Sequence, residues 1–381
     1  MRPQDRLTIL LTLRGRHAYT LRWLAYASQV RFPFTVHIAD GSLDDRMSAA
    51  LADPARFPHV RYEYHRYTPE GSHTDFYAKV ADALARIHTP FVAMGDNDDF
   101  FVAAGLKQAL TYLAAHPDYA SCGGQMASFW VSSRGADEDP LYGTSEWKCS
   151  CDARALDADS AHARLRSVAR WLRVPIYHHV RRTAELAALF RSLHALDVED
   201  VFLQELFLAF LTAISGKVRQ LDAICMAKQL NSPGSAASAH SAAHGDWLDR
   251  MLVPSWSSDF ARFLDETSAA LADRDRIPVA DAQRHLVDAY RMAVAPVLVS
   301  DLTTEPTVTV GATIALGMTR RLLALPSRHP VRRFATAMYR RLPWISPDVM
   351  QGTEWRGVPV AGAVDEIGPI HEFLTGRRPP V

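Results

Sequence analysis

Three aspartates stand within four positions directly after an apolar segment. The segment Phe91–Gly95 is followed by Asp96, Asn97, Asp98 and Asp99 before the chain becomes apolar again. The apolar run predicts a buried strand, so three carboxylates would repel one another at its end. Hard cations such as Mg²⁺ and Mn²⁺ prefer oxygen ligands and often bind one or two carboxylates together with phosphate oxygens. The spacing therefore predicts a site for a metal-bound diphosphate, although aspartates can also simply cap the helix that follows.

Alternating apolar segments place this cluster in a parallel sheet. Strands are predicted at 7–13, 34–39, 60–64, 91–95 and 119–131, helices at 19–28, 75–87 and 103–118, and a loop at 132–159. This order predicts an α/β fold with a doubly wound, mostly parallel sheet, whose ligands bind beyond the carboxyl ends of the strands. Three of the first four strands end there in polar residues: Thr12 and Arg14, Asp40 and Ser42, and Asp96 and Asp98.

These features resemble the nucleotide-sugar-binding half of GT-A glycosyltransferases of the family 2 type. The resemblance rests on the first strand and its helix, the turn Asp40-Gly41-Ser42, the cluster 96–99 and Leu106. The chain resembles more closely a bacterial branch of this superfamily that occurs in polysaccharide and surface-glycan clusters. The residues that carry this closer resemblance are Lys79, Phe100, Glu205-Leu206 and Gly216-Lys217. The resemblance implies a metal-dependent, inverting transfer of a sugar from a nucleotide-diphosphate donor to a glycan or glycolipid acceptor, with Mn²⁺ or Mg²⁺ as cofactor.

The resemblance also implies how the first two strand ends would bind the donor. Thr12 and Arg14 would line the nucleotide pocket, and Asp40 would hydrogen-bond the base with Ser42 beside it. The resemblance leaves the base and the sugar open.

The acidic cluster would bind the ribose and the diphosphate of the donor. The resemblance implies that Asp96, with Asn97 next to it, faces the ribose, and that Asp96 and Asp98 bind the metal that bridges the diphosphate. Such an ion would stabilise the departing diphosphate as a Lewis acid. Lys79 could reach the diphosphate as a point charge, or it could be a solvated lysine on a helix surface.

An inverting transfer needs one carboxylate to take the proton of the acceptor hydroxyl. Glu205 lies inside an apolar helical run, where partial desolvation would raise its pKa, and it is the first candidate. Asp200, at the start of the same helix, is the second, although plain N-terminal capping also explains it. Glu205 could instead be a structural glutamate paired with Lys217 or an arginine.

Two pairs of histidines could lie near the site. His178 and His179 fall in a strand predicted at 174–183, so they would point to opposite faces and at most one could reach the site. His240 and His244 would share a helix face, and some GT-A enzymes complete their metal site with a late histidine. His240 is therefore a candidate ligand, and a plain surface histidine is the alternative.

Residues 228–244 are low in complexity, which predicts a flexible segment and a domain boundary. We predict a GT-A domain at 1–235, a linker at 236–246 and a mainly helical domain at 247–381. Helical patterns in the last part fall at 260–272, 279–299, 309–325 and 331–342.

Residues 306–347 contain no acid and carry seven arginines among apolar and aromatic residues. Basic amphipathic helices lie on anionic membranes, which would bring the protein to a lipid-linked acceptor. The arginines could equally pair with acids elsewhere. No run reaches the roughly twenty apolar residues of a membrane span, and no secretory signal is recognisable. We therefore expect a cytoplasmic protein, with or without peripheral contact at the inner face of the cytoplasmic membrane.

Composition narrows the alternatives. The 381 residues include 42 Lys and Arg against 42 Asp and Glu, which gives no electrostatic reason to expect nucleic acid. The four cysteines match neither a disulfide framework nor a zinc spacing. Two other functions stay open. One is a nucleotidyltransferase on a similar sheet, for which Arg14-Gly15-Arg16 would be a thin phosphate loop, and the other is a non-catalytic glycan-binding or scaffold protein.

Overall fold

The computed structural model describes residues 5–132, 140–149, 154–170, 176–233, 245, 247–303 and 363–376. Its strands are β1 (Leu7–Leu13), β2 (Thr35–Asp40), β3 (Tyr62–Arg66), β4 (Phe91–Asp96), β5 (Phe100–Phe101), β6 (Tyr119–Ser132), β7 (Thr144–Cys149), β8 (Arg154–Leu156), β9 (Val180–Arg182) and β10 (Lys217–Gln229). Its helices are α1 (His17–Gln29), α2 (Arg46–Ala50), α3 (His73–Arg86), α4 (Ala103–Ala115), α5 (Ala161–Ala169), α6 (Thr183–Leu196), α7 (Val201–Ser215), α9 (Trp247–Met251), α10 (Trp256–Asp275), α11 (Val279–Thr303) and α14 (Ala363–Thr375).

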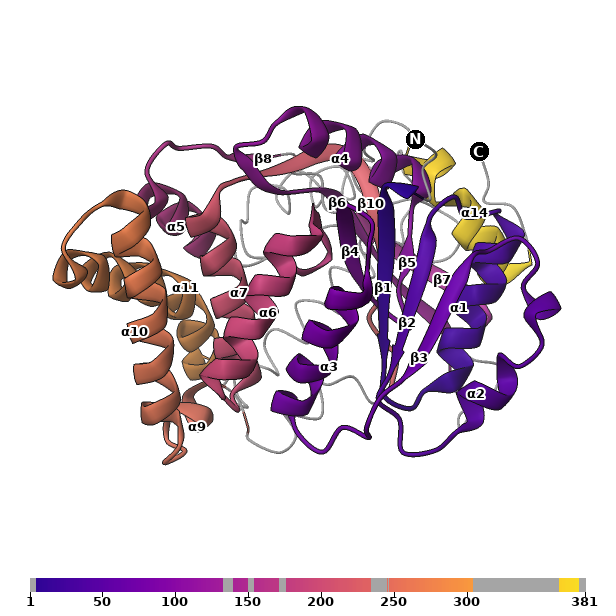
Figure 1. Ribbon diagram of the computed structural model, residues 1–381, viewed down its shortest axis with the longest axis horizontal. Coiled ribbons are helices and arrows are strands. Elements are labelled where there is room, and N and C mark those ends of the chain that lie inside the picture. Colours follow the sequence, from indigo (N-terminus) through magenta and orange to yellow (C-terminus); the bar gives the residue numbers. More distant parts are fainter. Residues whose placement is uncertain are drawn as a thin grey trace, which may run out of the picture.

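One mixed sheet runs through the described residues in the order β3-β2-β1-β4-β9-β6-β10-β5, with β7 paired to β6 and β8 to β10 (Figure 1). The pairs β2–β3, β1–β2, β1–β4 and β6–β10 are parallel, and the short strands β5, β7, β8 and β9 pair antiparallel. Thr12 of β1 is aligned with both Ala39 and Asp96, and Leu13 is aligned with Asp40. The carboxyl ends of β1, β2 and β4 therefore meet at one edge of the sheet.

Helices cover both faces of the sheet. Every residue of β1 is buried, which is why its sequence is almost continuously apolar rather than alternating. Leu7, Ile9, Leu11 and Leu13 pack into a core shared with α1, α4 and α14, whereas Leu10 packs into a second core with α3, α6, α7, α10 and α11. The predicted α/β class, with a doubly wound, mostly parallel sheet and a helical C-terminal region, is confirmed.

Two local predictions were wrong. The segment predicted as a loop at 132–159 contains β7 and β8, because Trp147 is buried and stacks on Phe129 of β6 with ring centroids 4.8 Å apart. The strand predicted at 174–183 is a 3₁₀ turn at Ile176–His178 followed by the short strand β9. Both segments carry too few apolar residues in a regular pattern for periodicity to identify them.

The last described helix returns to the sheet and does not join α10 and α11, as Figure 1 shows. The ring of Phe373 meets Tyr26 and Phe100 edge-on, at centroid distances of 5.6 and 6.1 Å. The Glu366 carboxylate accepts a hydrogen bond of 2.9 Å from the backbone N–H of Ile224. Helix α14 therefore closes the core directly behind the acidic turn that follows β4.

Among the described residues, no helix is both long enough and apolar enough to cross a membrane. The predicted helices at 309–325 and 331–342, the arginine-rich segment 306–347 and nearly all of the predicted linker lie outside the described residues. The domain boundaries therefore stay predictions.

Candidate functional site

Asp96, Asp98 and Asp99, here called the acidic cluster, lie at the carboxyl edge of the sheet. Asp96 is the last residue of β4, and its side chain is 39% exposed. Asp98 and Asp99 follow in the turn before β5, and both are buried. Asn97 between them donates hydrogen bonds of 3.2 Å to the carbonyl oxygen of Arg16 and the hydroxyl of Thr20, so it fastens the turn to the start of α1.

Asp98 is bound by groups of the protein itself. Its carboxylate lies 2.9 Å from the guanidinium of Arg16 and accepts a hydrogen bond from the hydroxyl of Ser232. Its carbonyl oxygen accepts a hydrogen bond of 2.7 Å from Arg22. Burial alone would raise the pKa of Asp98, but Arg16, Ser232 and Lys228 together lower it. The metal-binding role implied for Asp98 stays a prediction. In this structure the Asp98 carboxylate is paired with Arg16.

Asp99 is tied to the end of β10. One carboxylate oxygen accepts a hydrogen bond of 2.9 Å from the backbone N–H of Gln229, and the other lies 3.4 Å from the ammonium of Lys228. The same ammonium lies 3.7 Å from Asp96. Burial, and then the charges of Asp98 and Asp96, raise the pKa of Asp99 well above its usual value, although Lys228 opposes this. Asp99 in turn is the main cause of a raised pKa at Lys228.

A histidine completes a group of possible metal ligands. Ligand atoms of Asp96, Asp99 and His178 all lie within 4.8 Å of one another. Burial lowers the pKa of His178 to about 4, so its imidazole is neutral near pH 7. Its Nδ1 lies 3.0 Å from the carbonyl oxygen of Met94, which can only accept, so Nδ1 carries the proton and Nε2 keeps its lone pair. Two carboxylates and one neutral imidazole fit a divalent cation.

The prediction that at most one of the two adjacent histidines could reach the site agrees with this arrangement, although the reason differs. The 3₁₀ turn, not strand alternation, separates them. His179 lies 3.3 Å from the hydroxyl of Ser121, and its ring fills the space beside Gly123. His240, the other histidine candidate, lies outside the described residues.

The polar residues at the ends of β1 and β2 are joined to one another. Asp40 is fully buried, and its two carboxylate oxygens accept hydrogen bonds from the backbone N–H of Ser42, at 2.9 Å, and the hydroxyl of Tyr64, at 2.8 Å. The hydroxyl of Ser42 accepts a 2.7 Å hydrogen bond from the backbone N–H of Gly15. These bonds hold the two strand ends in a fixed arrangement, beside which Arg14 is exposed.

Lys79 lies beneath these strand ends. It is buried, which excludes the alternative of a solvated surface lysine. Its ammonium donates to the carbonyl oxygens of Leu13 and Ala39, at 3.2 and 3.3 Å, and to the Glu70 carboxylate at 2.5 Å. Burial lowers the pKa of Lys79 although Glu70 opposes the shift. The Glu70 side chain fills the space where a Cβ at Gly41 would lie. A role of Lys79 at the diphosphate stays a prediction, because three protein oxygens engage its ammonium here.

Glu205 and Asp200 have different surroundings although both belong to α7. Asp200 is the N-cap, since its side chain accepts hydrogen bonds of 3.0 Å from the backbone N–H groups of Phe202 and Leu203, and it lies 3.5 Å from Arg250. Helix capping therefore explains the position of Asp200 at the start of α7.

Glu205 is exposed on the second turn of α7. Desolvation by neighbouring atoms raises its pKa, the charges of Asp96 and Asp200 act in the same direction, and Lys228 and Arg250 oppose them. Asp96 of the acidic cluster thus acts on Glu205, which indicates that α7 brings this carboxylate toward the same edge. The alternative pairing with Lys217 is wrong, because that lysine pairs with Asp118 and Asp159 at 3.0 and 3.5 Å.

Three residues of this arrangement were given no individual role from the sequence. Asp99, His178 and Lys228 converge from the β4–β5 turn, the 3₁₀ turn and the end of β10. Lys228 was assigned to the flexible segment 228–244, yet it belongs to β10. The signal that could have identified it is the apolar run Ala223–Ala227 that ends in a charged residue, as β4 does.

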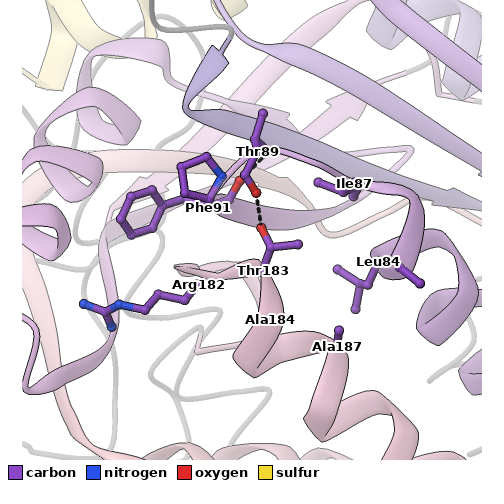
Figure 2. A pocket seen from close by; sticks show the side chains of 10 residues that line it. Leu84, Ile87, Thr89, Phe91, Arg182, Thr183, Ala184 and Ala187 are labelled. Carbon is purple, nitrogen blue, oxygen red and sulfur yellow. Dashed lines mark hydrogen bonds between the residues drawn. The ribbon is translucent and has the colours of Figure 1, made fainter. Parts of the chain in front are cut away.

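A pocket of about 510 Å³ lies at the other end of β4 (Figure 2). Its lining is mainly apolar, and Thr183 donates a 2.7 Å hydrogen bond to the carbonyl oxygen of Thr89 at its wall. Phe91 at the pocket and Asp96 at the acidic cluster are the two ends of the same strand, roughly 16 Å apart at the rise of a β-strand. This pocket is therefore separate from the candidate site.

No protein-family model and no curated protein matches the chain. In structure it is similar to residues 1–349 of Staphylococcus aureus TarS in complex with UDP-GlcNAc, with 15% identity and a TM-score of 0.47 over 87% of each chain. It is also similar to the mannosyltransferase PcManGT from Pyrobaculum calidifontis in complex with GDP-Man and Mn²⁺, with 16% identity and a TM-score of 0.39 over 88% of this chain and 84% of that chain. Both similarities are weak, so the functional conclusions below rest on residues of this chain.

Proposed function

We propose that the chain is a metal-dependent GT-A glycosyltransferase that transfers a sugar from a nucleotide-diphosphate donor to a glycan or glycolipid acceptor with inversion. One observation carries the proposal. At the carboxyl edge of a parallel sheet, where such folds bind ligands, ligand atoms of Asp96, Asp99 and His178 lie within 4.8 Å of one another, and the charge of Asp96 acts on Glu205 of a separate element, α7. The carboxylates of the acidic cluster can bind a metal ion, and Glu205 can accept a proton. The reaction requires both.

Asp96, Asp99 and His178 would hold Mn²⁺ or Mg²⁺. Their ligand atoms lie within 4.8 Å of one another, and His178 is neutral with its Nε2 lone pair available. Asp96 is the partly exposed member, so it would stand closest to a bound donor. When bound, the ion would supply Lewis-acid stabilisation of the charge on the departing diphosphate.

Glu205 would act as the general base. It would accept the proton of the acceptor hydroxyl while that oxygen attacks the anomeric carbon and the bond to the diphosphate breaks. The raised pKa of Glu205 supports this role, since a carboxylate that binds a proton more readily is a stronger base near neutral pH. Asp200 stays the second candidate, although its carboxylate caps α7.

The ends of β1 and β2 would bind the nucleoside. Thr12, Arg14, Asp40 and Ser42 lie at the same edge as Asp96, and the hydrogen bonds among Asp40, Ser42 and neighbouring groups make this part of the edge rigid. Arg14 is exposed there and supplies a guanidinium suited to phosphate oxygens.

The test is Glu205→Gln, which keeps the shape of the side chain but cannot take the proton. Calorimetry with nucleoside diphosphates and Mn²⁺ should show unchanged donor affinity. Release of nucleoside diphosphate from a panel of nucleotide sugars, with glycan acceptors present, should fall about 10²–10⁴-fold. The matched control is Glu199→Gln, an exposed glutamate just before α7, which should retain the parent rate.

The outcomes separate the alternatives. Unchanged turnover in Glu205→Gln together with a collapse in Asp200→Asn would transfer the role to Asp200. Full activity in both variants would contradict the inverting mechanism and favour a retaining one. Release of pyrophosphate from nucleoside triphosphates by the parent would indicate a nucleotidyltransferase, and donor binding without any turnover would indicate a non-catalytic protein.

A further inference from the structure

The end of β10 holds the acidic cluster from one side. Ala227 is paired with Phe100 of β5, which places Lys228 and Gln229 next to the turn that contains the cluster. The backbone N–H of Gln229 binds Asp99 at 2.9 Å, and just beyond the strand the hydroxyl of Ser232 binds Asp98. The sheet register therefore fixes where the Lys228 side chain begins.

The ammonium of Lys228 is shared by two of the carboxylates. It lies 3.4 Å from Asp99 and 3.7 Å from Asp96, and these are the two acids whose oxygens, with His178, could hold a metal ion. Asp98 has a separate cation, since Arg16 lies 2.9 Å from it. A third cation, Arg22, adds its charge from the carbonyl oxygen of Asp98. Lys228 is the cation that contacts both carboxylates of the candidate metal site.

We propose that Lys228 is the resident cation of the acidic cluster, and that a divalent ion reaches Asp96 and Asp99 only by displacing its ammonium. The identity of the ion rests on the proposed function. The competition itself follows from contacts, because an ammonium and a divalent ion cannot both lie between the same two carboxylates without strong repulsion.

The displacement needs only a change of side-chain conformation. Lys228 is 33% exposed, and its four-carbon stem is flexible, so the ammonium can leave the two carboxylates while β10 stays paired. Without an ion, the lysine keeps the cluster from repelling itself. The parent protein should therefore bind Mn²⁺ alone weakly, and the oxygens of a donor diphosphate would supply the additional ligands that favour the ion.

The experiment measures Mn²⁺ binding to the full chain by calorimetry, with no donor present. Lys228→Gln removes the competing charge and should bind Mn²⁺ about ten-fold or more tightly than the parent. The matched control is Lys217→Gln, the same substitution on the first residue of β10, where the lysine pairs with Asp118 and Asp159. Lys217→Gln should leave the Mn²⁺ affinity unchanged.

Thermal unfolding gives a second reading. Lys228→Gln should melt below the parent in the absence of metal, because Asp96 and Asp99 lose their shared cation, and Mn²⁺ should raise its melting temperature more than that of the parent. Lys228→Arg, which keeps the charge, should bind Mn²⁺ no more tightly than the parent. Lys228→Met, which keeps the stem, replaces the glutamine variant if that variant does not fold.

Equal Mn²⁺ affinity in Lys228→Gln and Lys217→Gln would overturn the proposal, and so would weaker binding in Lys228→Gln or no Mn²⁺ binding in either. None of these measurements depends on turnover. An increase in Mn²⁺ affinity in a protein that transfers no sugar would keep the role of Lys228 and remove the transferase proposal.

Discussion

Lys79 shows at the scale of one residue how a charged side chain can be part of the framework. Its ammonium is buried and bonded to two strand-end carbonyl oxygens and to Glu70, which is itself only 5% exposed. A buried pair of this kind contributes little to stability as a pair. Removal of one partner is costly, because the other charge then stays buried without compensation.

Lys79→Met should lower the free energy of unfolding by about 3–5 kcal/mol in denaturant titrations, because the Glu70 carboxylate loses its partner. The double variant with Glu70→Leu should recover much of that loss. Lys107→Met, at an exposed lysine on α4, is the control and should change stability by less than about 0.5 kcal/mol. A Lys79→Met protein that is as stable as the parent but has lost affinity for nucleoside diphosphates would instead support the diphosphate role.

The sequence predicted the acidic cluster and its place at a strand end, but not the partner of each carboxylate. Asp98 forms an ion pair with Arg16, which has a left-handed backbone with φ of 54°, and Asp99 forms one with Lys228. The second contact joins residues that are 129 positions apart, and it depends on the register of β10 against β5. Local spacing carries no information on such a contact. Glu205 could be selected from the sequence because it is a single acid inside an apolar helical run, and its role as a base stays a prediction.

At the scale of elements, the strands predicted most accurately from the sequence are those that are most buried. Strands β1, β2 and β4 are buried on both faces and read as apolar runs, so they were predicted almost to the residue. Strand β7 was not, because its sequence Thr144–Cys149 contains no apolar run. One of its residues is Trp147, whose indole N–H donates a 2.8 Å hydrogen bond to Ser145 and lies 3.3 Å from Nδ1 of His371 on α14.

His371 makes the docking of α14 sensitive to pH. Burial lowers its pKa, and its Nδ1 lies 2.9 Å from the hydroxyl of Ser145, which itself accepts the hydrogen bond from Trp147. Above about pH 6.5 the imidazole is neutral in both the folded and the unfolded state, so stability is at its full value. As pH falls below that value, the unfolded chain binds the proton more readily, and stability should fall by up to about 1.4 kcal/mol per pH unit.

Unfolding free energies between pH 7.5 and 5 test this expectation. His371→Gln should show a smaller loss toward acid than the parent, whereas His59→Gln, at an exposed histidine, should show the same loss as the parent. Parallel pH profiles for the parent and His371→Gln would contradict it.

At the scale of the whole molecule, two helical groups flank the sheet. Helices α10 and α11 extend the core that α7 and α5 begin, at the end of the molecule opposite α14 (Figure 1). The acidic cluster and Glu205 lie where the parallel strands end, and Glu205 comes from the helix that also packs against α10. The arginine-rich segment 306–347 stands in the sequence between α11 and α14, and its membrane contact stays a prediction.

Arg332→Gln combined with Arg333→Gln tests that contact without removing α14. Binding to vesicles that contain anionic lipid should weaken roughly ten-fold or more at low salt, since each basic residue near such a surface contributes about 1 kcal/mol. Higher salt should reduce the difference, because charges are screened beyond about 8 Å at physiological ionic strength. The control replaces Arg284 and Arg291, whose side chains are 73% and 75% exposed on α11. Equal vesicle binding by both double variants and the parent would remove the membrane interpretation.

The return of α14 to the sheet also constrains how the protein can be made. This helix is translated after every other described element, yet its Phe373 covers Tyr26 and Phe100, which belong to the first quarter or so of the sequence. On a translating ribosome the amino-terminal strands can pair early, but the apolar surface behind the acidic turn stays open to water until residues 363–376 have left the exit tunnel. The nascent chain therefore carries an unfinished core through most of its synthesis, and it is in this period that chaperones would have a surface to bind.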